Sequence, residues 1–329
     1  MKTRTILLIL FMIIFLIPSV SAGNPLVVAS TAPLAEIIKE AFGNSVNVEY
    51  LIPPSVDPHQ YQLTPDQVEF IKKADVIVTS NGHLPVERKI KELREEDTIH
   101  AEVLLAEDYA KYGFRFLPER WYDNKRNPHG IWLDPYNALA ISEATKNALI
   151  ARYPANREIY ENSYNEFKAK VLGIVEAYKA LVPKNVTVVV EFPSQQYALE
   201  WLGVKVVASI KPEEEIPAKS VDEMLEIAKS VDFIAYSSKT PETLKNAAVE
   251  LSKKTGKPLA EITTIWTDKP YTEILIENSK AIIDALNQKT IVIQQNTNVE
   301  VENINVTYII LALIIGVSLG ITVGVLLMK

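Results

Sequence analysis

Apolar positions along the chain follow two alternating spacings, and this alternation predicts an α/β protein. Short apolar runs of the strand type, such as residues 27–30 and 46–52, are followed by segments with the three- and four-residue spacing of a helix. Gly43 ends one expected helix, and Pro53-Pro54 ends one expected strand. Strands and helices that alternate at such short intervals predict parallel βαβ units.

The second half of the chain repeats this plan. Strands are expected at residues 186–190, 204–210, 233–237 and 258–264, and helices at 195–202, 221–229, 241–254 and 271–286. With a shift of 157 residues, segment 65–80 aligns with 222–237, and five of sixteen positions are identical, Asp75/Asp232 and Ser80/Ser237 among them. Helix–strand units share such patterns, so the match supports two lobes of one design and nothing more.

A long helical pattern separates the two halves. It runs over residues 155–181, between Pro154 and Pro183. A helix of about 27 residues spans ~40 Å, roughly the length of a lobe. The predicted fold is therefore α/β, with two lobes of parallel βαβ units joined by one long helix. The expected boundaries are 23–154 for the N-terminal lobe, 155–182 for the linking helix and 183–288 for the C-terminal lobe.

The two ends of the chain have the patterns of export and anchoring segments. Residues 1–22 combine Lys2 and Arg4 with an apolar stretch and a small-residue cleavage site, as in a secretory signal peptide. Residues 308–328 form an uncharged run of 21 residues, long enough to cross a bilayer as a helix. We therefore expect a C-terminal transmembrane helix after a tether at 289–307, which anchors an exported protein to the outer face of the cell membrane.

Composition narrows the classes of function. The formal net charge of −7 over 329 residues argues against a nucleic-acid-binding protein. The absence of cysteine excludes disulfides, thiolate metal sites, cysteine nucleophiles and the usual lipoprotein acceptor. We expect a tethered monomer.

Histidines and carboxylates stand in loops that adjoin predicted strand ends or helix starts. His59 and His129 each directly follow a proline, while Glu191 and Asp268 each follow a predicted strand. The carboxyl ends of parallel strands gather ligand-binding loops. Two imidazoles and two carboxylates suit Mn, Fe or Zn better than Ca or Cu(I). On the residues alone, a purely structural role for these four side chains stays equally open.

Two segments resemble the signatures of a known family. Residues 51–66, Leu-Ile-Pro-Pro-Ser-Val-Asp-Pro-His-Gln-Tyr-Gln-Leu-Thr-Pro-Asp, resemble the first signature of the metal-binding solute-binding proteins of ABC transporters, the TroA/ZnuA/PsaA-like cluster. Residues 129–138 resemble the second signature, except that Gly130 is inserted between the histidine and the Ile-Trp-Leu-Asp-Pro run. The resemblance covers roughly residues 25–288 and implies two α/β lobes that hold a metal ion between them.

The resemblance also implies ligands and a function. It places metal ligands at His59, His129 and Glu191, and a fourth at Asp268, with Glu261 or a water molecule as the alternative. It implies a binding protein, not an enzyme, that captures Mn²⁺, Zn²⁺ or Fe²⁺ outside the membrane and delivers the ion to an ABC transporter permease. Zinc-specific members of the family often carry a histidine-rich loop and a third histidine among the metal ligands. Neither feature is expected in this chain.

Other residues and functions complete the expectations. His83 is expected in a surface or capping role, with the cleft as the alternative, and His100 in a structural strand. The polar stretch 109–126 is expected to be a solvated loop, with a permease-facing surface as the alternative. The alternative functions are a membrane-anchored adhesion or scaffold protein of the same fold and, further behind, a secreted metallohydrolase.

Overall fold

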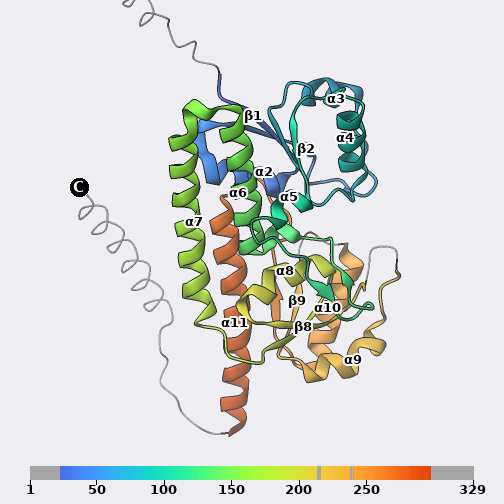
Figure 1. Ribbon diagram of the computed structural model, residues 1–329. Coiled ribbons are helices and arrows are strands. Elements are labelled where there is room, and N and C mark those ends of the chain that lie inside the picture. The colour runs from blue at the N-terminus through green and yellow to red at the C-terminus, as the bar shows by residue number, and fades with distance from the viewer. Residues whose placement is uncertain (1–22, 213–215, 238, 240, 298–329) are drawn as a thin grey trace, which may run out of the picture.

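The computed structural model describes residues 23–212, 216–237, 239 and 241–297, and these form two α/β lobes (Figure 1). We call the elements around the first sheet the N-terminal lobe and those around the second sheet the C-terminal lobe. The main sheet of each lobe has four strands, all of them parallel. This confirms the predicted α/β class with βαβ units.

The N-terminal lobe has the strand order β2-β1-β3-β4. Its strands are β1 (Leu26–Thr31), β2 (Asn47–Ile52), β3 (Val76–Val78) and β4 (Glu102–Leu104). Its helices are α2 (Ala32–Phe42), α3 (Pro65–Ile71), α4 (Pro85–Glu95) and α5 (Ala106–Ala110), with a 3₁₀ turn at Gly43–Ser45. Helix α4 was not predicted from the sequence, because it is strongly charged, and the strand expected around His100 lies slightly later, as the three-residue β4.

The C-terminal lobe has the order β8-β7-β9-β10, so the two sheets share one topology. Its strands are β7 (Thr187–Val190), β8 (Lys205–Ser209), β9 (Phe233–Tyr236) and β10 (Leu259–Glu261). Its helices are α8 (Gln196–Leu199), between 3₁₀ turns at Pro193–Gln195 and Glu200–Leu202, α9 (Val221–Ser230), α10 (Glu242–Thr255) and α11 (Tyr271–Thr297).

The weak internal repeat corresponds to equivalent contacts in the two sheets. The Asp75 Oδ2 accepts a hydrogen bond from the backbone N of Leu26 at 2.8 Å, where β1 starts. The Asp232 Oδ2 accepts one from the backbone N of Thr187 at 2.7 Å, where β7 starts. In each lobe the aspartate before the third strand therefore satisfies the first donor of the central strand, which gives the aligned pair a physical reason.

Long helices connect the lobes. Helix α6 (Pro135–Arg152) leads through a 3₁₀ turn at Pro154–Asn156 to α7 (Arg157–Lys179), and α7 contacts α2, α6 and α11 (Figure 1). One side of α7 is buried at three- and four-residue spacing, by Tyr160, Tyr164, Phe167, Val171, Val175 and Tyr178. The amphipathic pattern therefore explains why this helix lies against the other long helices rather than standing alone in solvent.

The C-terminal helix differs from its expected extent. Helix α11 continues past residue 286 to Thr297, into the segment expected as a tether, because no glycine or proline interrupts residues 271–297. Within the described part of the chain, no helix is both long and apolar enough to cross a membrane. The expected signal peptide (1–22) and anchor (308–328) lie outside the described residues.

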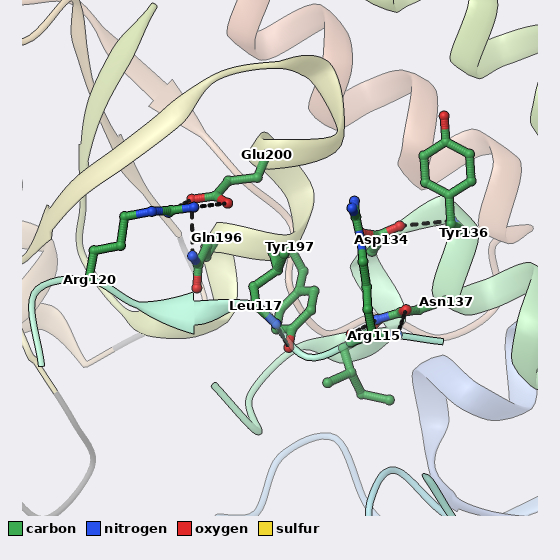
Figure 2. Close-up of polar contacts among 10 residues, drawn as sticks. Arg115, Leu117, Arg120, Asp134, Tyr136, Asn137, Gln196, Tyr197 and Glu200 are labelled. Carbon is green, nitrogen blue, oxygen red and sulfur yellow. Dashed lines mark hydrogen bonds and ion pairs between the residues drawn. The ribbon is translucent and has the colours of Figure 1, made fainter. Parts of the chain in front are cut away.

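The stretch expected as a solvated loop instead ties the lobes together. Residues 114–126, which we call the crossover segment, carry a small hairpin of β5 (Pro118–Glu119) and β6 (Lys125–Arg126) and lie against α8 (Figure 2). The Leu117 backbone N donates to the Tyr197 hydroxyl at 2.9 Å, and that hydroxyl donates to the Asn127 carbonyl at 2.7 Å. The apolar side chains of Phe114 and Leu117 are buried, which explains the packing.

Charged and amide groups extend this connection on both sides (Figure 2). Arg120 pairs with Glu200, and the Gln196 Nε2 donates to the Pro118 carbonyl at 3.0 Å. At the other end, the Arg115 guanidinium lies 3.2 Å from Asp134, which caps α6 by accepting from the Tyr136 backbone N at 2.8 Å. Burial raises the pKa of the Asp134 carboxyl, against the opposing effect of Arg115. The crossover segment thus contacts both the α6 cap and the C-terminal lobe.

Replacing Tyr197 with Phe tests this connection. The substitution removes one hydroxyl and leaves a buried N–H and a carbonyl without their partner, so the free energy of unfolding should fall by about 1–3 kcal/mol. Tyr236→Phe is the matched control, because the Tyr236 hydroxyl bonds an exposed carboxylate and its loss should cost less than about 0.5 kcal/mol. Urea unfolding measures both values, and equal losses would contradict the role assigned to Tyr197.

Candidate metal centre

Three histidines meet where the lobes face each other. His59, His83 and His129 each offer a ring nitrogen, and these nitrogens all lie within 4.8 Å of one another. The ring centroids are 5.2 Å apart for His59 and His83, 5.5 Å for His59 and His129, and 5.7 Å for His83 and His129. Tetrahedral Zn–N bonds of ~2.0 Å place ligand nitrogens about 3.3 Å apart, so small side-chain rotations suffice for coordination.

The same local hydrogen bond positions the backbone of each histidine. In each case the side-chain Oδ1 of an Asp or Asn two residues earlier accepts a hydrogen bond from the backbone N–H of the histidine. The pairs are Asp57–His59 at 2.9 Å, Asn81–His83 at 3.1 Å and Asn127–His129 at 2.9 Å. Such turns fix the backbone before the imidazole and reduce the conformational freedom lost when a ligand binds.

A short sequence pattern is common to all three histidines of the cluster. Asp-Pro-His, Asn-Gly-His and Asn-Pro-His are three copies of one Asx-X-His pattern, and each copy supplies one member of the cluster. His83 lines the cleft beside His59 and His129, which is the alternative expected for it, so the expected surface or capping role is wrong. His100 has no such neighbour; it is exposed, precedes β4 instead of lying in it, and faces Asp97 at 3.4 Å.

Strand ends and a buried glutamate place the His83 loop. His59 and His83 follow the carboxyl ends of the parallel strands β2 and β3. The fully buried Glu87 carboxylate of α4 accepts hydrogen bonds from the Ser80 N and Oγ, the Gly82 N and the Ser30 Oγ, at 2.5–2.9 Å. The Asn81 Nδ2 donates to the Pro128 carbonyl at 2.9 Å. The loops of His83 and His129 are thus joined directly.

The inserted glycine lies at a close backbone contact between the lobes. Gly130 has φ +73°, and a Cβ at this position would lie 2.6 Å from the Ser194 backbone oxygen. Only glycine adopts this conformation and this approach without strain. The departure from the family signature at Gly130 therefore has a local steric reason, and it keeps the His129 loop against the C-terminal lobe.

Glu191 directly follows the carboxyl end of β7. It is fully buried, and its Oε2 accepts a hydrogen bond from the Ser237 backbone N at 2.7 Å. The next residue, Phe192, has its ring centroid 5.8 Å from that of His129. Glu191 is not a member of the group of nitrogens within 4.8 Å, although it adjoins that group through Phe192.

Asp268 and Glu261 are not brought to the histidines. Asp268 is exposed with φ 59°, and Glu261 is exposed and accepts a hydrogen bond from the Tyr236 hydroxyl at 3.1 Å. Burial, helped by the carboxylates of Glu261 and Glu191, raises the pKa of that hydroxyl. Among the residues that the structure describes, neither acid lines the cleft around the histidines.

That cleft has a volume of about 610 Å³ and is lined from both lobes. The N-terminal side contributes the histidines, Asp57 and Trp132, and the C-terminal side contributes Phe192, Lys211, Lys239, Leu244 and Ile265. The Trp132 Nε1 donates to the Thr264 carbonyl at 2.9 Å, which closes one end of the cleft across the lobes. The arrangement offers three nitrogen ligands on one wall and mixed apolar and cationic groups on the other.

Known proteins are similar to this chain over most of its length. The zinc-binding lipoprotein AdcA of Streptococcus pneumoniae is 24% identical over 291 residues, 81% of this chain and 57% of AdcA, so the chain spans little more than half the length of that relative. The high-affinity zinc uptake system protein ZnuA of Bacillus subtilis is 26% identical over 290 residues, 81% of this chain and 89% of that protein.

Solved structures and a family model agree with these relatives. A crystal structure of ZnuA superposes with a TM-score of 0.65 at 18% identity, and the match covers 80% of this chain and 99% of that one, which shows the same fold. The family model described as "ZnuA: Zinc-uptake complex component A periplasmic" matches residues 27–285 and confirms the resemblance of the two signature segments. The chain therefore belongs to the ZnuA family.

Proposed function

We propose that the protein captures one divalent transition-metal ion in the cleft and delivers it to an ABC transporter permease, as a solute-binding protein rather than an enzyme. The observation that carries the proposal is the cluster of three histidine nitrogens within 4.8 Å. Imidazole is a good ligand for Zn, Fe and Ni. AdcA and ZnuA of B. subtilis are named for zinc, in agreement with a nitrogen-rich site.

The proposed ligands are His59, His83, His129 and Glu191. Glu191 stays in the set because it is a buried carboxylate next to Phe192, which contacts the His129 ring. Three neutral imidazoles and one carboxylate resemble a tetrahedral zinc site and favour Zn²⁺ over Mn²⁺, which prefers more oxygen ligands. Asp268, the fourth ligand expected from the family resemblance, is exposed outside the cleft lining and is left out of the proposed set.

The ligands divide between the lobes in a way that couples binding to their closure. His59 and His83 come from loops of the N-terminal lobe, and Glu191 comes from the end of β7 in the C-terminal lobe. A metal ion held by both sides stabilises one relative position of the lobes. The crossover segment and the long helices α7 and α11 bridge the lobes, so we propose that binding orders the cleft loops more than it rotates the lobes.

The proposed setting is the outer face of a membrane. Export is supported by the pattern of residues 1–22, and anchoring by the uncharged run 308–328, which stands in place of the cysteine that a lipid anchor needs. The metal-loaded form would then present its cleft face to the permease.

Alanine substitutions of the four histidines test the proposed function. The purified protein, stripped of metal and reloaded, should bind one Zn²⁺ per chain. His59→Ala, His83→Ala and His129→Ala should each weaken this binding about 100-fold or more, because even outer-shell substitutions cost 10–100-fold. Competition with a chromophoric chelator measures the affinity, and the shift of the melting temperature provides a second measure.

The fourth histidine supplies the control. His100→Ala removes an imidazole that is exposed and outside the cluster, so its Zn²⁺ affinity should equal that of the unmodified protein. Absence of stoichiometric metal in the unmodified protein, or an equal loss in all four variants, would contradict the proposal and favour a scaffold or adhesion role.

A pair of carboxylate variants tests the fourth ligand. Glu191→Gln keeps the size and the carbonyl oxygen but removes the charge, and it should weaken Zn²⁺ binding by about tenfold or more. Asp268→Asn makes the same change at an exposed position and should leave the affinity unchanged. The same titration applies to both variants, and the reverse order of effects would restore Asp268 as the ligand.

A further inference from the structure

We propose that Asn81 is a positioning residue that makes His83 bind the metal ion through its Nε2 atom. This inference rests on the proposed function, because it specifies how one ligand is presented to the cleft. The observation behind it is a contact between the Asn81 Oδ1 and the His83 Nδ1. Both side chains belong to the loop between β3 and α4.

Two backbone groups fix the orientation of the Asn81 amide. The backbone N of His83 donates a hydrogen bond to the Asn81 Oδ1 at 3.1 Å. The Asn81 Nδ2 donates a hydrogen bond to the Pro128 carbonyl at 2.9 Å. A backbone N–H is only a donor and a backbone carbonyl only an acceptor, so exchange of the amide oxygen and nitrogen would lose both bonds. The amide oxygen, and not the NH₂ group, therefore faces the imidazole of His83.

This oxygen decides which nitrogen of the His83 ring carries the proton. An amide oxygen only accepts hydrogen bonds, so the Nδ1 of His83 must be the donor and must carry a hydrogen. An imidazole binds metal in its neutral form, which has a single N–H group. The lone pair that can bind a metal ion is then on Nε2. An acceptor behind a ligand histidine fixes the tautomer and the orientation of its ring in this way.

The backbone around Asn81 is also held in place. The buried Glu87 carboxylate accepts hydrogen bonds from the backbone N atoms of Ser80 and Gly82, at 2.5 and 2.9 Å. These two residues flank Asn81 directly, so its short side chain starts from a backbone that is restrained on both sides. The amide oxygen is thus a fixed acceptor before the metal ion arrives, which lowers the ordering cost of binding.

NMR of the metal-free protein with ¹⁵N-labelled histidine tests the inference. The chain has four histidines, and the His83→Ala variant identifies the His83 signals by their loss. At about pH 8, where imidazoles are neutral, the ¹⁵N frequencies show which ring nitrogen is protonated. We expect a protonated Nδ1 for His83, and added Zn²⁺ should shift the Nε2 signal while Nδ1 keeps its proton. A protonated Nε2 in the metal-free protein, or Zn²⁺ on Nδ1, would overturn the inference and leave metal capture intact.

Two substitutions separate the contact with the ring from the bond to Pro128. Asn81→Leu removes both, so it should release the tautomer and weaken Zn²⁺ binding by about 10–100-fold. Asn81→Asp keeps an acceptor oxygen for the ring but removes the donor to Pro128, so Nδ1 should stay protonated and Zn²⁺ should bind more tightly than in Asn81→Leu. Asn165→Leu, at an exposed position of α7, is the control and should change neither property. Equal losses in both Asn81 variants, or an unchanged affinity after Asn81→Leu, would contradict the role of Asn81.

A double variant shows whether Asn81 acts through His83. In that case Asn81→Leu should cause no further loss of Zn²⁺ affinity in the His83→Ala protein. A further loss as large as in the unmodified protein would place the effect in the His129 loop and overturn the inference. Unmodified protein that binds no Zn²⁺, or an unchanged affinity after His83→Ala, would instead overturn the proposed function or its ligand set.

Discussion

The structure depends on one requirement: three imidazoles from distant parts of the sequence must be held close together before a ligand arrives. The chain holds the backbone of each loop with hydrogen bonds next to the histidine. An Asx residue two positions earlier accepts the N–H of each histidine, and two of the loops start at the carboxyl ends of parallel strands. The buried carboxylate of Glu87 also holds the His83 loop to the sheet. Preorganisation of this kind lowers the ordering cost of binding, which is why a site made of loops can still be well defined.

The connection between the lobes follows from the same requirement. The cleft has one wall from each lobe, so its shape depends on the relative position of the two lobes. The crossover segment reaches from the α6 cap to α8, and the Tyr197 hydroxyl bonds the Leu117 backbone N of this segment and the carbonyl of Asn127, which directly follows it. Gly130 permits a backbone approach to Ser194 that a side chain would block. Asn127 links the histidine cluster to the C-terminal lobe, because its side chain donates to the Pro193 carbonyl and accepts from the backbone N of His129. On the proposed function, we therefore expect binding and lobe position to be coupled through residues 127–130.

Much of the fold was predictable, because strand and helix spacings in this chain are clear and proline and glycine mark their ends. The aligned aspartates Asp75 and Asp232 even proved to make equivalent hydrogen bonds. The sequence was less informative where short or charged elements depend on tertiary contacts, as with α4 and the crossover hairpin. At the site, His59 and His129 were predicted from family signatures, whereas His83 was missed because no signature includes it. The position of Asp268 relative to the cleft depends on how a loop after β10 folds, which residue patterns do not specify.

The central claim is that three imidazoles, and not two, hold the metal. X-ray absorption spectroscopy at the zinc edge of the loaded protein tests it most directly, because multiple scattering from imidazole rings reports how many histidines bind. The account predicts three histidine nitrogens at ~2.0 Å with one or two oxygen ligands, and two histidines after His83→Ala. Two histidines in the unmodified protein, with no change after His83→Ala, would contradict it.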